Sequence, residues 1–164
     1  MFAGKTTELI RRLAAAQASG LDVLAVKPRS DSRSGHARLA THHGRAFPAI
    51  DVADPEEIPE RPGVIAVDEA HFFGPALTPV CDRLLLAGKR LIIAGVHLDH
   101  RGRPFEPFPS LLPRADESVQ LFAPCARCGR PAVHSHRKAH AEGRIVVGGA
   151  DLYEPRCEAC FDPS

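Results

Sequence analysis

The chain has 164 residues, enough for one domain with a buried core, and a formal net charge of +1. This near-neutral charge provides no general attraction to nucleic acid or to an acidic membrane surface. No segment reaches the roughly 20 apolar residues that a membrane span requires, and the N-terminus lacks the pattern of a secretory signal. We therefore expect a cytoplasmic protein.

The first residues contain the second half of a phosphate-binding loop. Gly4, Lys5 and Thr6 match the end of the motif G-x-x-x-x-G-K-[ST]. In such a loop the glycine lets backbone N–H groups close on phosphate oxygens, the lysine meets the β/γ charge and the hydroxyl binds Mg²⁺. The sequence contains neither the first glycine of the motif nor the strand that should lead into it. We therefore expect a truncated N-terminus with the first strand missing.

Strands alternate with helices along most of the chain. In chain order, the pattern predicts a helix over residues 6–19, a buried strand over 22–27, a polar loop over 29–47, a short acidic helix with a linker over 49–62, a strand over 63–68, a helix over 77–85 and a strand over 90–95. An irregular stretch over 101–113, with a short helix near Leu111, precedes a last strand over 118–123. This alternation favours an α/β fold whose sheet is mostly parallel, with helices on both faces.

Four of the five cysteines form two C-x-x-C pairs, Cys125 with Cys128 and Cys157 with Cys160. Two such pairs typically place four thiolates around Zn²⁺ with no open coordination position, which makes the site structural. We therefore divide the chain into an α/β domain over 1–123 and a zinc-binding subdomain over 124–164. The fifth cysteine, Cys81, lies on the apolar face of a predicted helix, so we expect it in the core.

Two adjacent carboxylates follow the second buried strand. Asp68 stands where nucleotide-binding α/β folds place the acid that organises Mg²⁺, and Glu69 is next to it. Neighbouring residues of an extended chain point in opposite directions. We therefore expect one carboxylate to hold metal and the other to face the substrate as a general base.

Taken in order, the sequence segments resemble the thymidine kinase family of the zinc-containing type. The resemblance rests on Met1–Arg12, Asp31-Ser-Arg33, Asp68–Phe73, Asp99–Phe105, Gly148–Tyr153 and the two C-x-x-C pairs, and it covers essentially the whole chain. It implies a P-loop NTPase-like α/β domain with a zinc-bound lasso. It also implies ATP- and Mg²⁺-dependent phosphorylation of the 5′-hydroxyl of thymidine or deoxyuridine. A homotetramer with feedback inhibition by the triphosphate product is implied too.

The resemblance also assigns residue roles. It implies that ATP, phosphate and Mg²⁺ are bound by Gly4, Lys5, Thr6, Thr7, Asp31, Arg33 and Asp68. Glu69 matches the base that takes the 5′-hydroxyl proton. The nucleoside would contact Phe72, His100, Phe105, Ser135, Val146, Val147, Gly148 and Tyr153.

Some positions depart from the family pattern. The family usually has Leu-Asp where this chain has Val96-His97, an aromatic residue where it has His100, and often Gln where it has His71. These histidines represent either neutral change or a change with functional effect, namely an altered nucleoside preference or reduced activity. The alternative function is a catalytically impaired nucleotide-binding or regulatory homologue of the same fold. A zinc-ribbon nucleic-acid binder is a further alternative, which the near-neutral charge and scarce aromatic residues disfavour.

Overall fold

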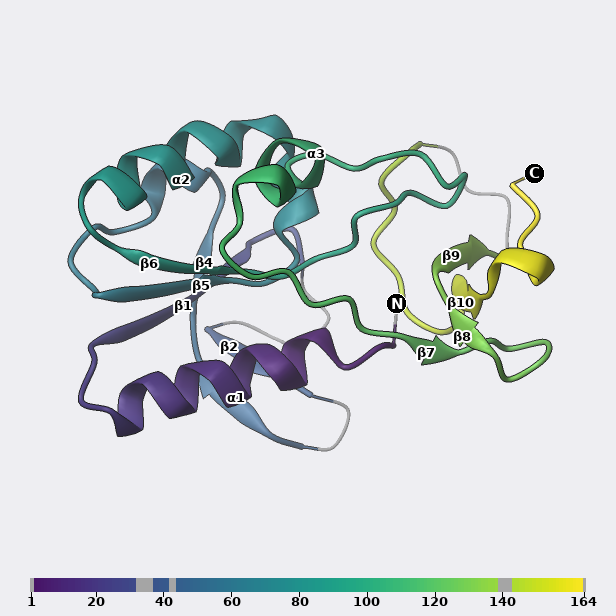
Figure 1. The fold of residues 1–164 in the computed structure, drawn as a ribbon, viewed down its shortest axis with the longest axis horizontal. Helices are drawn as coiled ribbons and strands as arrows, with labels where there is room; N and C mark the ends of the chain where they lie inside the picture. The colour runs from purple at the N-terminus through teal and green to yellow at the C-terminus, as the bar shows by residue number, and fades with distance from the viewer. Residues whose placement is uncertain (1, 32–36, 42–43, 139–142, 164) are drawn as a thin grey trace.

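The computed structural model describes residues 2–31, 37–41, 44–138 and 143–163, which form an α/β part and a smaller module that carries the cysteines (Figure 1). The α/β part is built on a four-stranded sheet in the order β4-β1-β5-β6, and every neighbouring pair in it is parallel. Its strands are β1 (Val23–Pro28), β4 (Ile50–Val52), β5 (Val64–Val67) and β6 (Arg90–Ile93). The predicted α/β class with a mostly parallel sheet is confirmed.

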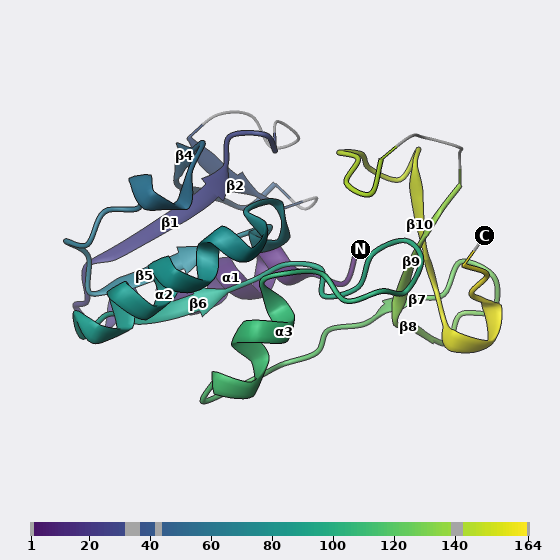
Figure 2. The same ribbon diagram turned by 90° about the horizontal axis from the view of Figure 1, so that it is seen from above.

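Two helices cover opposite faces of this sheet (Figures 1 and 2). On one face, α1 (Lys5–Ala18) buries Leu9, Ile10 and Leu13 against the sheet. On the other, α2 (Leu77–Leu86) buries a second apolar stripe that includes Leu84. Both helices were predicted from apolar residues spaced at the helical period, because that spacing aligns them on one face. The same face of α2 carries Cys81, which is 2% exposed and lies in the core as expected.

Two predictions between β1 and β5 were incomplete. The stretch 29–47, predicted as a loop, contains β2 (Arg38–Ala40), which pairs antiparallel with β3 (Ala46–Pro48). The stretch predicted as an acidic helix and linker contains the edge strand β4 before a 3-10 helix at Pro55–Glu57. These strands have three residues each, too few to show a clear alternation of apolar and polar side chains.

The predicted strand over 118–123 was largely wrong. Residues 116–122 have no strand assignment, and only Ala123 belongs to a strand, the two-residue β7 (Ala123–Pro124). Val119 and Phe122 are about half exposed. An apolar run forms a strand only where a neighbouring strand accepts its backbone hydrogen bonds. In the described chain no strand lies beside residues 118–122.

The cysteine module consists of the described residues of 124–163. Its strands pair antiparallel: β7 with β8 (Pro131–Ala132), and β9 (His134–Arg137) with β10 (Tyr153–Arg156). The short helix α3 (Phe108–Leu111) lies in the connection to this module, as predicted near Leu111. Within the described residues, further 3-10 helices span Ala70–Phe72, Gly74–Ala76, Leu112–Arg114 and Glu158–Cys160. Of the helices described, none is long and apolar enough to cross a membrane.

Candidate active site

The predicted phosphate loop leads directly into α1. Gly4 has a φ of 80°, in the left-handed region that glycine adopts without strain, and Lys5 is the first residue of the helix. The first backbone N–H groups of a helix have no partner inside it and carry the positive end of the helix dipole. This end of α1 can therefore receive phosphate oxygens. Thr7 in the first turn is exposed.

Thr6 joins the loop to the end of strand β5. Its hydroxyl donates a hydrogen bond of 2.8 Å to Oδ2 of Asp68, which follows β5 directly and is 4% exposed. Burial raises the pKa of Asp68 to about 6, and the neighbouring charge of Glu69 adds to this. The bond from Thr6 and the charge of Lys5 act in the opposite direction. The hydroxyl and this carboxylate are hard oxygen groups of the kind that Mg²⁺ prefers, and they could hold such an ion.

The backbone turns at Glu69, the residue that follows Asp68. Glu69 has a φ of 48°, a left-handed conformation that costs a residue with a side chain about 1 kcal/mol. Its N–H donates a 2.9 Å hydrogen bond to Oδ1 of Asp68, and its carboxylate lies 3.5 Å from Nδ1 of His71. The two carboxylates therefore contact different groups, although Glu69 does not have the extended backbone on which the expectation from the sequence was based.

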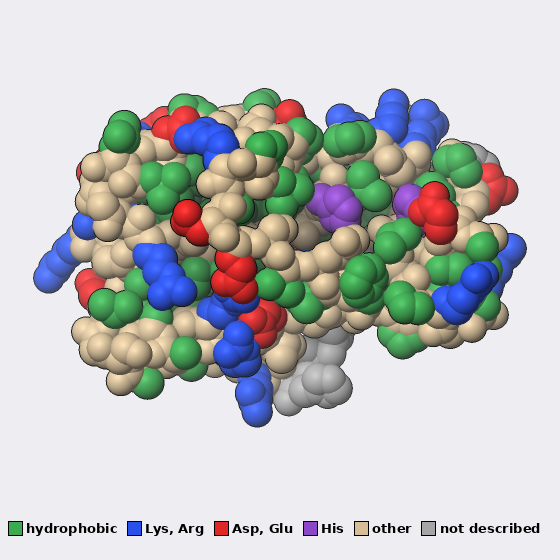
Figure 3. Space-filling view, viewed as in Figure 1, with side chains coloured by type: hydrophobic (Ala, Val, Ile, Leu, Met, Phe, Trp, Pro, Cys, Tyr) green, Lys and Arg blue, Asp and Glu red, His purple; other side chains and the backbone are tan. Residues whose placement is uncertain are grey.

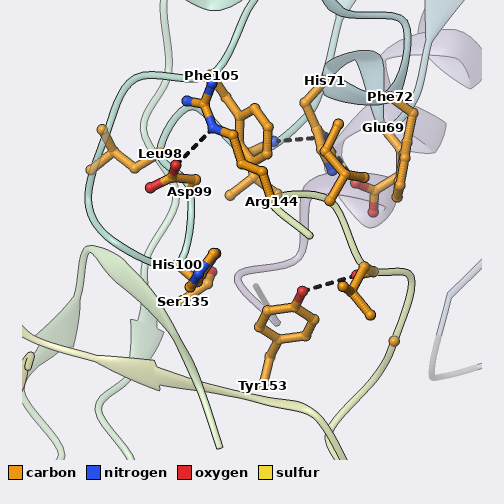
Figure 4. A pocket seen from close by; sticks show the side chains of 14 residues that line it. Glu69, His71, Phe72, Leu98, Asp99, His100, Phe105, Ser135, Arg144 and Tyr153 are labelled. Atoms are coloured by element: carbon orange, nitrogen blue, oxygen red, sulfur yellow. Dashed lines mark hydrogen bonds and ion pairs between the residues drawn. The ribbon is translucent and has the colours of Figure 1, made fainter. Parts of the chain in front are cut away.

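A hollow lies in front of Glu69, between the α/β part and the cysteine module (Figures 3 and 4). It encloses about 490 Å³ of space, which is open to solvent. The lining residues that the sequence predicted are Glu69, Phe72, His100, Phe105, Ser135, Val146, Gly148 and Tyr153. Val147 does not line the hollow, and its side chain is 37% exposed.

The walls of the hollow come from distant segments. Tyr153 on β10 donates a 2.9 Å hydrogen bond to the carbonyl of Val146, which holds the segment 143–149 beside the hollow. A Cβ at Gly148 would come within 2.3 Å of the Leu152 side chain, so a larger residue there would force Leu152 to move. Burial lowers the pKa of His100, and the charge of Arg137 adds to this effect.

The remaining predicted phosphate-side residues are Asp31 and Arg33. Asp31 lies just beyond β1 and is 6% exposed, while Arg33 lies outside the described residues. The backbone carbonyl of Asp31 accepts a 3.0 Å hydrogen bond from Nζ of Lys27, a lysine 1% exposed at the end of β1. Because β1 and β5 are parallel neighbours, Asp31 and Asp68 follow the same edge of the sheet.

The four predicted cysteine ligands lie together, with every sulfur within 4.8 Å of the others. Sγ of Cys128 is 3.5 Å from that of Cys157 and 3.6 Å from that of Cys160. Sulfurs bound tetrahedrally at about 2.3 Å from zinc lie roughly 3.8 Å apart, so this cluster fits the ion. The hydrogen bond to the Cys128 sulfur raises the pKa of Cys160 to about 12. Thiolates this close together repel one another, and a cation bound between them offsets that repulsion.

Sequence reasoning missed several lining residues, chiefly Asp99, Arg144 and Ile145. Asp99 accepts hydrogen bonds from the N–H groups of Arg101 and Arg103, a turn pattern that an aspartate near a glycine often forms. That pattern was a usable signal for Asp99. No local feature of the sequence indicates the position of Arg144, whose partner lies in a distant segment.

Comparison with known proteins agrees with this geometry. The sequence matches the family model for thymidine kinase over residues 1–161. It is 44% identical to a thymidine kinase of Rhodothermus sp. (strain ITI 518), with 99% of this chain and 78% of that protein aligned. It is 39% identical to a thymidine kinase of Halobacterium salinarum (strain R1), covering 98% and 89% of the two chains. For a thymidine kinase of Coprothermobacter proteolyticus the identity is 41%, over 96% and 84%. The family match over nearly the whole chain and these identities show that the chain belongs to the thymidine kinase family.

Proposed function

We propose that the chain transfers the γ-phosphoryl group of ATP, with Mg²⁺, to the 5′-hydroxyl of thymidine or deoxyuridine. The observation that carries the proposal is the hydrogen bond from Thr6 to Asp68, with Glu69 directed away from it into the hollow. Phosphate-binding groups and a candidate base thus meet at one edge of the sheet. Phosphoryl transfer depends mainly on such positioning and on charge stabilisation.

The phosphate side would consist of Gly4, Lys5, Thr6 and Thr7, together with Asp31, Arg33 and Asp68. Thr6 and Asp68 would hold Mg²⁺, which supplies positive charge to the phosphate oxygens when it is bound. Lys5 would add charge from the start of α1. A cation beside Asp68 would also favour its ionised form, against the burial that raises its pKa.

On the nucleoside side, Glu69 would take the proton of the 5′-hydroxyl while that oxygen forms its bond to the γ-phosphorus and ADP leaves. Phe72, His100 and Phe105 would surround the nucleoside. Main-chain groups of Val146 and Gly148 would meet the edge of the base, since both residues line the hollow and Tyr153 holds Val146 in place. Ser135 would lie beside them.

The cysteine module would act as a clamp. Zinc held by Cys125, Cys128, Cys157 and Cys160 would fix β9 and β10, which carry Ser135 and Tyr153. This supports a division into an α/β kinase domain over 1–123 and a zinc-binding lasso over 124–164. From the family resemblance we further propose a homotetramer in the cytoplasm.

A phosphorylation assay tests the proposed function. Wild-type protein with ATP and Mg²⁺ is expected to convert thymidine, and deoxyuridine as a second substrate, to the 5′-monophosphate. The Glu69→Gln variant should lose at least about 100-fold in kcat, because general-base catalysis contributes on that order. Its affinity for ATP should stay within about twofold, since Glu69 faces the hollow and not the phosphate loop.

Glu60→Gln is the matched control, because Glu60 is exposed and pairs with Arg83 on α2. Unchanged turnover in Glu69→Gln would remove Glu69 from the mechanism. A wild-type protein that binds ATP but phosphorylates no pyrimidine deoxynucleoside would be the catalytically impaired homologue.

A further inference from the structure

Asp99 is a carboxylate in the loop 96–105, on the wall of the hollow, and its side chain is fully buried. The N–H groups of Arg101 and Arg103 donate to Oδ1 at 2.9 and 2.8 Å. Burial alone would raise the pKa of Asp99, but the N–H of Arg103, then the side chain of Arg144 and the N–H of Arg101, hold it below its usual range. The carboxylate is therefore a charged, fixed acceptor.

Two arginines reach the other oxygen of Asp99. Nε of Arg103 lies 3.2 Å from Oδ2 and comes from the same loop. Nε of Arg144 lies 2.8 Å from Oδ2 and comes from the cysteine module (Figure 4). The two cations thus share one carboxylate, but only the second contact connects two separate segments of the chain.

The Arg144 guanidinium makes two more contacts with the loop 96–105. It donates a 2.6 Å hydrogen bond to the carbonyl of Pro104, and its Cζ lies 4.8 Å from the centre of the Phe105 ring. A planar guanidinium can make all three contacts at once, which the ammonium of a lysine cannot. The ring of His71 lies 5.4 Å from that of Phe105, so the phenyl group is held from two sides.

Contacts inside the module hold the rest of the segment 143–149. Tyr153 donates to the carbonyl of Val146, and Arg137 on β9 donates to the carbonyl of Gly143 at 2.9 Å. Those bonds fix the segment to its own module. The Arg144 contacts fix it to the α/β part, across the hollow.

We propose that Arg144 is a positioning residue that latches the segment 143–149 onto the loop 96–105 and so holds the nucleoside wall closed. This rests on the proposed function, since the wall is where the nucleoside would bind. The latch acts through Asp99 and Phe105 and takes no part in the bonds that form or break. The latch should therefore strengthen the binding of the nucleoside and leave the binding of ATP unchanged.

The experiment compares Arg144→Ala with Arg103→Ala, because both remove an arginine from the same carboxylate. For Arg144→Ala we expect the KM for thymidine to rise about tenfold, as expected for losing a partly exposed charge-assisted contact, with the KM for ATP and kcat within about twofold. Arg103→Ala should change the KM for thymidine less than about twofold. Arg144→Lys should recover only a small part of the loss.

Hydrogen exchange of the protein without nucleoside is the second measurement. Arg144→Ala should speed exchange at the amides of 145–149 by about tenfold, whereas Arg103→Ala should leave it unchanged. This result does not depend on catalysis, so a protein without kinase activity would still reveal the latch. Equal effects of the two variants, or unaltered exchange in Arg144→Ala, would overturn the proposal.

Discussion

In the α/β part, apolar side chains such as Leu13, Val26 and Ile65 form two buried clusters on either side of the sheet. In the cysteine module, the buried cluster consists of Cys125, Ala132 and Cys157, with Cys160 packed against it. Arginine side chains also donate hydrogen bonds within this module, for example Arg137 to the carbonyl of Gly143 and Arg156 to the carboxylate of Glu154. Hydrophobic burial therefore stabilises the α/β part. The cysteine module relies more on its four-cysteine cluster and on hydrogen bonds of its arginines.

This difference concerns how each region stays folded. A region without a large apolar core needs a metal or a covalent link to stay folded. Yet the same region carries Ser135, Val146 and Tyr153 of the hollow. The proposed nucleoside wall therefore lies partly in the region with the smaller apolar core.

Loss of the metal should have the largest effect. We expect one zinc ion per chain. Cys157→Ser should lose this ion, and with it most of the free energy of zinc binding, which is roughly 10 kcal/mol at structural sites. Residues 124–163 should then become open to proteolysis and thymidine binding should be lost, while the helical circular dichroism of α1 and α2 remains.

Cys81→Ser is the control for that experiment. Cys81 is buried in the α/β part, where burial raises the pKa of its thiol to about 11. This variant should keep its zinc and lower only the stability of the α/β part. Protein purified without chelator that contains no zinc would contradict the role of the cluster.

A core substitution should affect the other region. Leu13 is fully buried between α1 and the sheet, so Leu13→Ala should lower the free energy of unfolding by about 3 kcal/mol through lost burial and the cavity left behind. Zinc content should not change. Leu86→Ala, at a side chain 89% exposed on α2, should leave the unfolding midpoint in urea almost unchanged. A similar loss in both variants would contradict the position of the core.

The surface charges of the α/β part should matter least. Hydrogen bonds from Arg11 and then Arg12 lower the pKa of Glu8 from 4.5 to about 2. A lowered carboxylate pKa stabilises the fold above the unfolded value, and this contribution is lost as the pH falls from 4.5 toward 2.

Because Glu8 is partly exposed, Glu8→Gln should cost less than about 1 kcal/mol at neutral pH. The difference from wild type in thermal unfolding should shrink as the solution is acidified, and high salt should reduce it at any pH. A difference that grows on acidification would contradict the assigned cause.

Sequence reasoning succeeded where one segment carries the whole signal. The helical spacing of Leu9, Ile10 and Leu13 and the apolar run of β5 each predicted an element correctly. The paired C-x-x-C motifs likewise predicted the cysteine cluster. In each case the residues that form the structure are neighbours, or stand at a spacing that the chemistry requires.

The failures share the opposite cause. Residues 118–122 have a strand-like composition but no neighbouring strand in the described chain, and composition cannot supply one. The strand β4 is short and contains Asp51, so it shows no clear apolar run. The contact of Arg144 with Asp99 joins residues far apart in the sequence, and only the folded chain brings them together.

The left-handed backbone at Glu69 has a consequence for how this site tolerates change. Because a single turn of the chain separates the surroundings of Asp68 and Glu69, the order of the two acids matters as much as their identity. Exchanging them would preserve the composition and charge of the dipeptide, but it would place a longer side chain against Thr6 and a shorter one toward the hollow. The two positions are therefore not interchangeable, although they carry the same functional group.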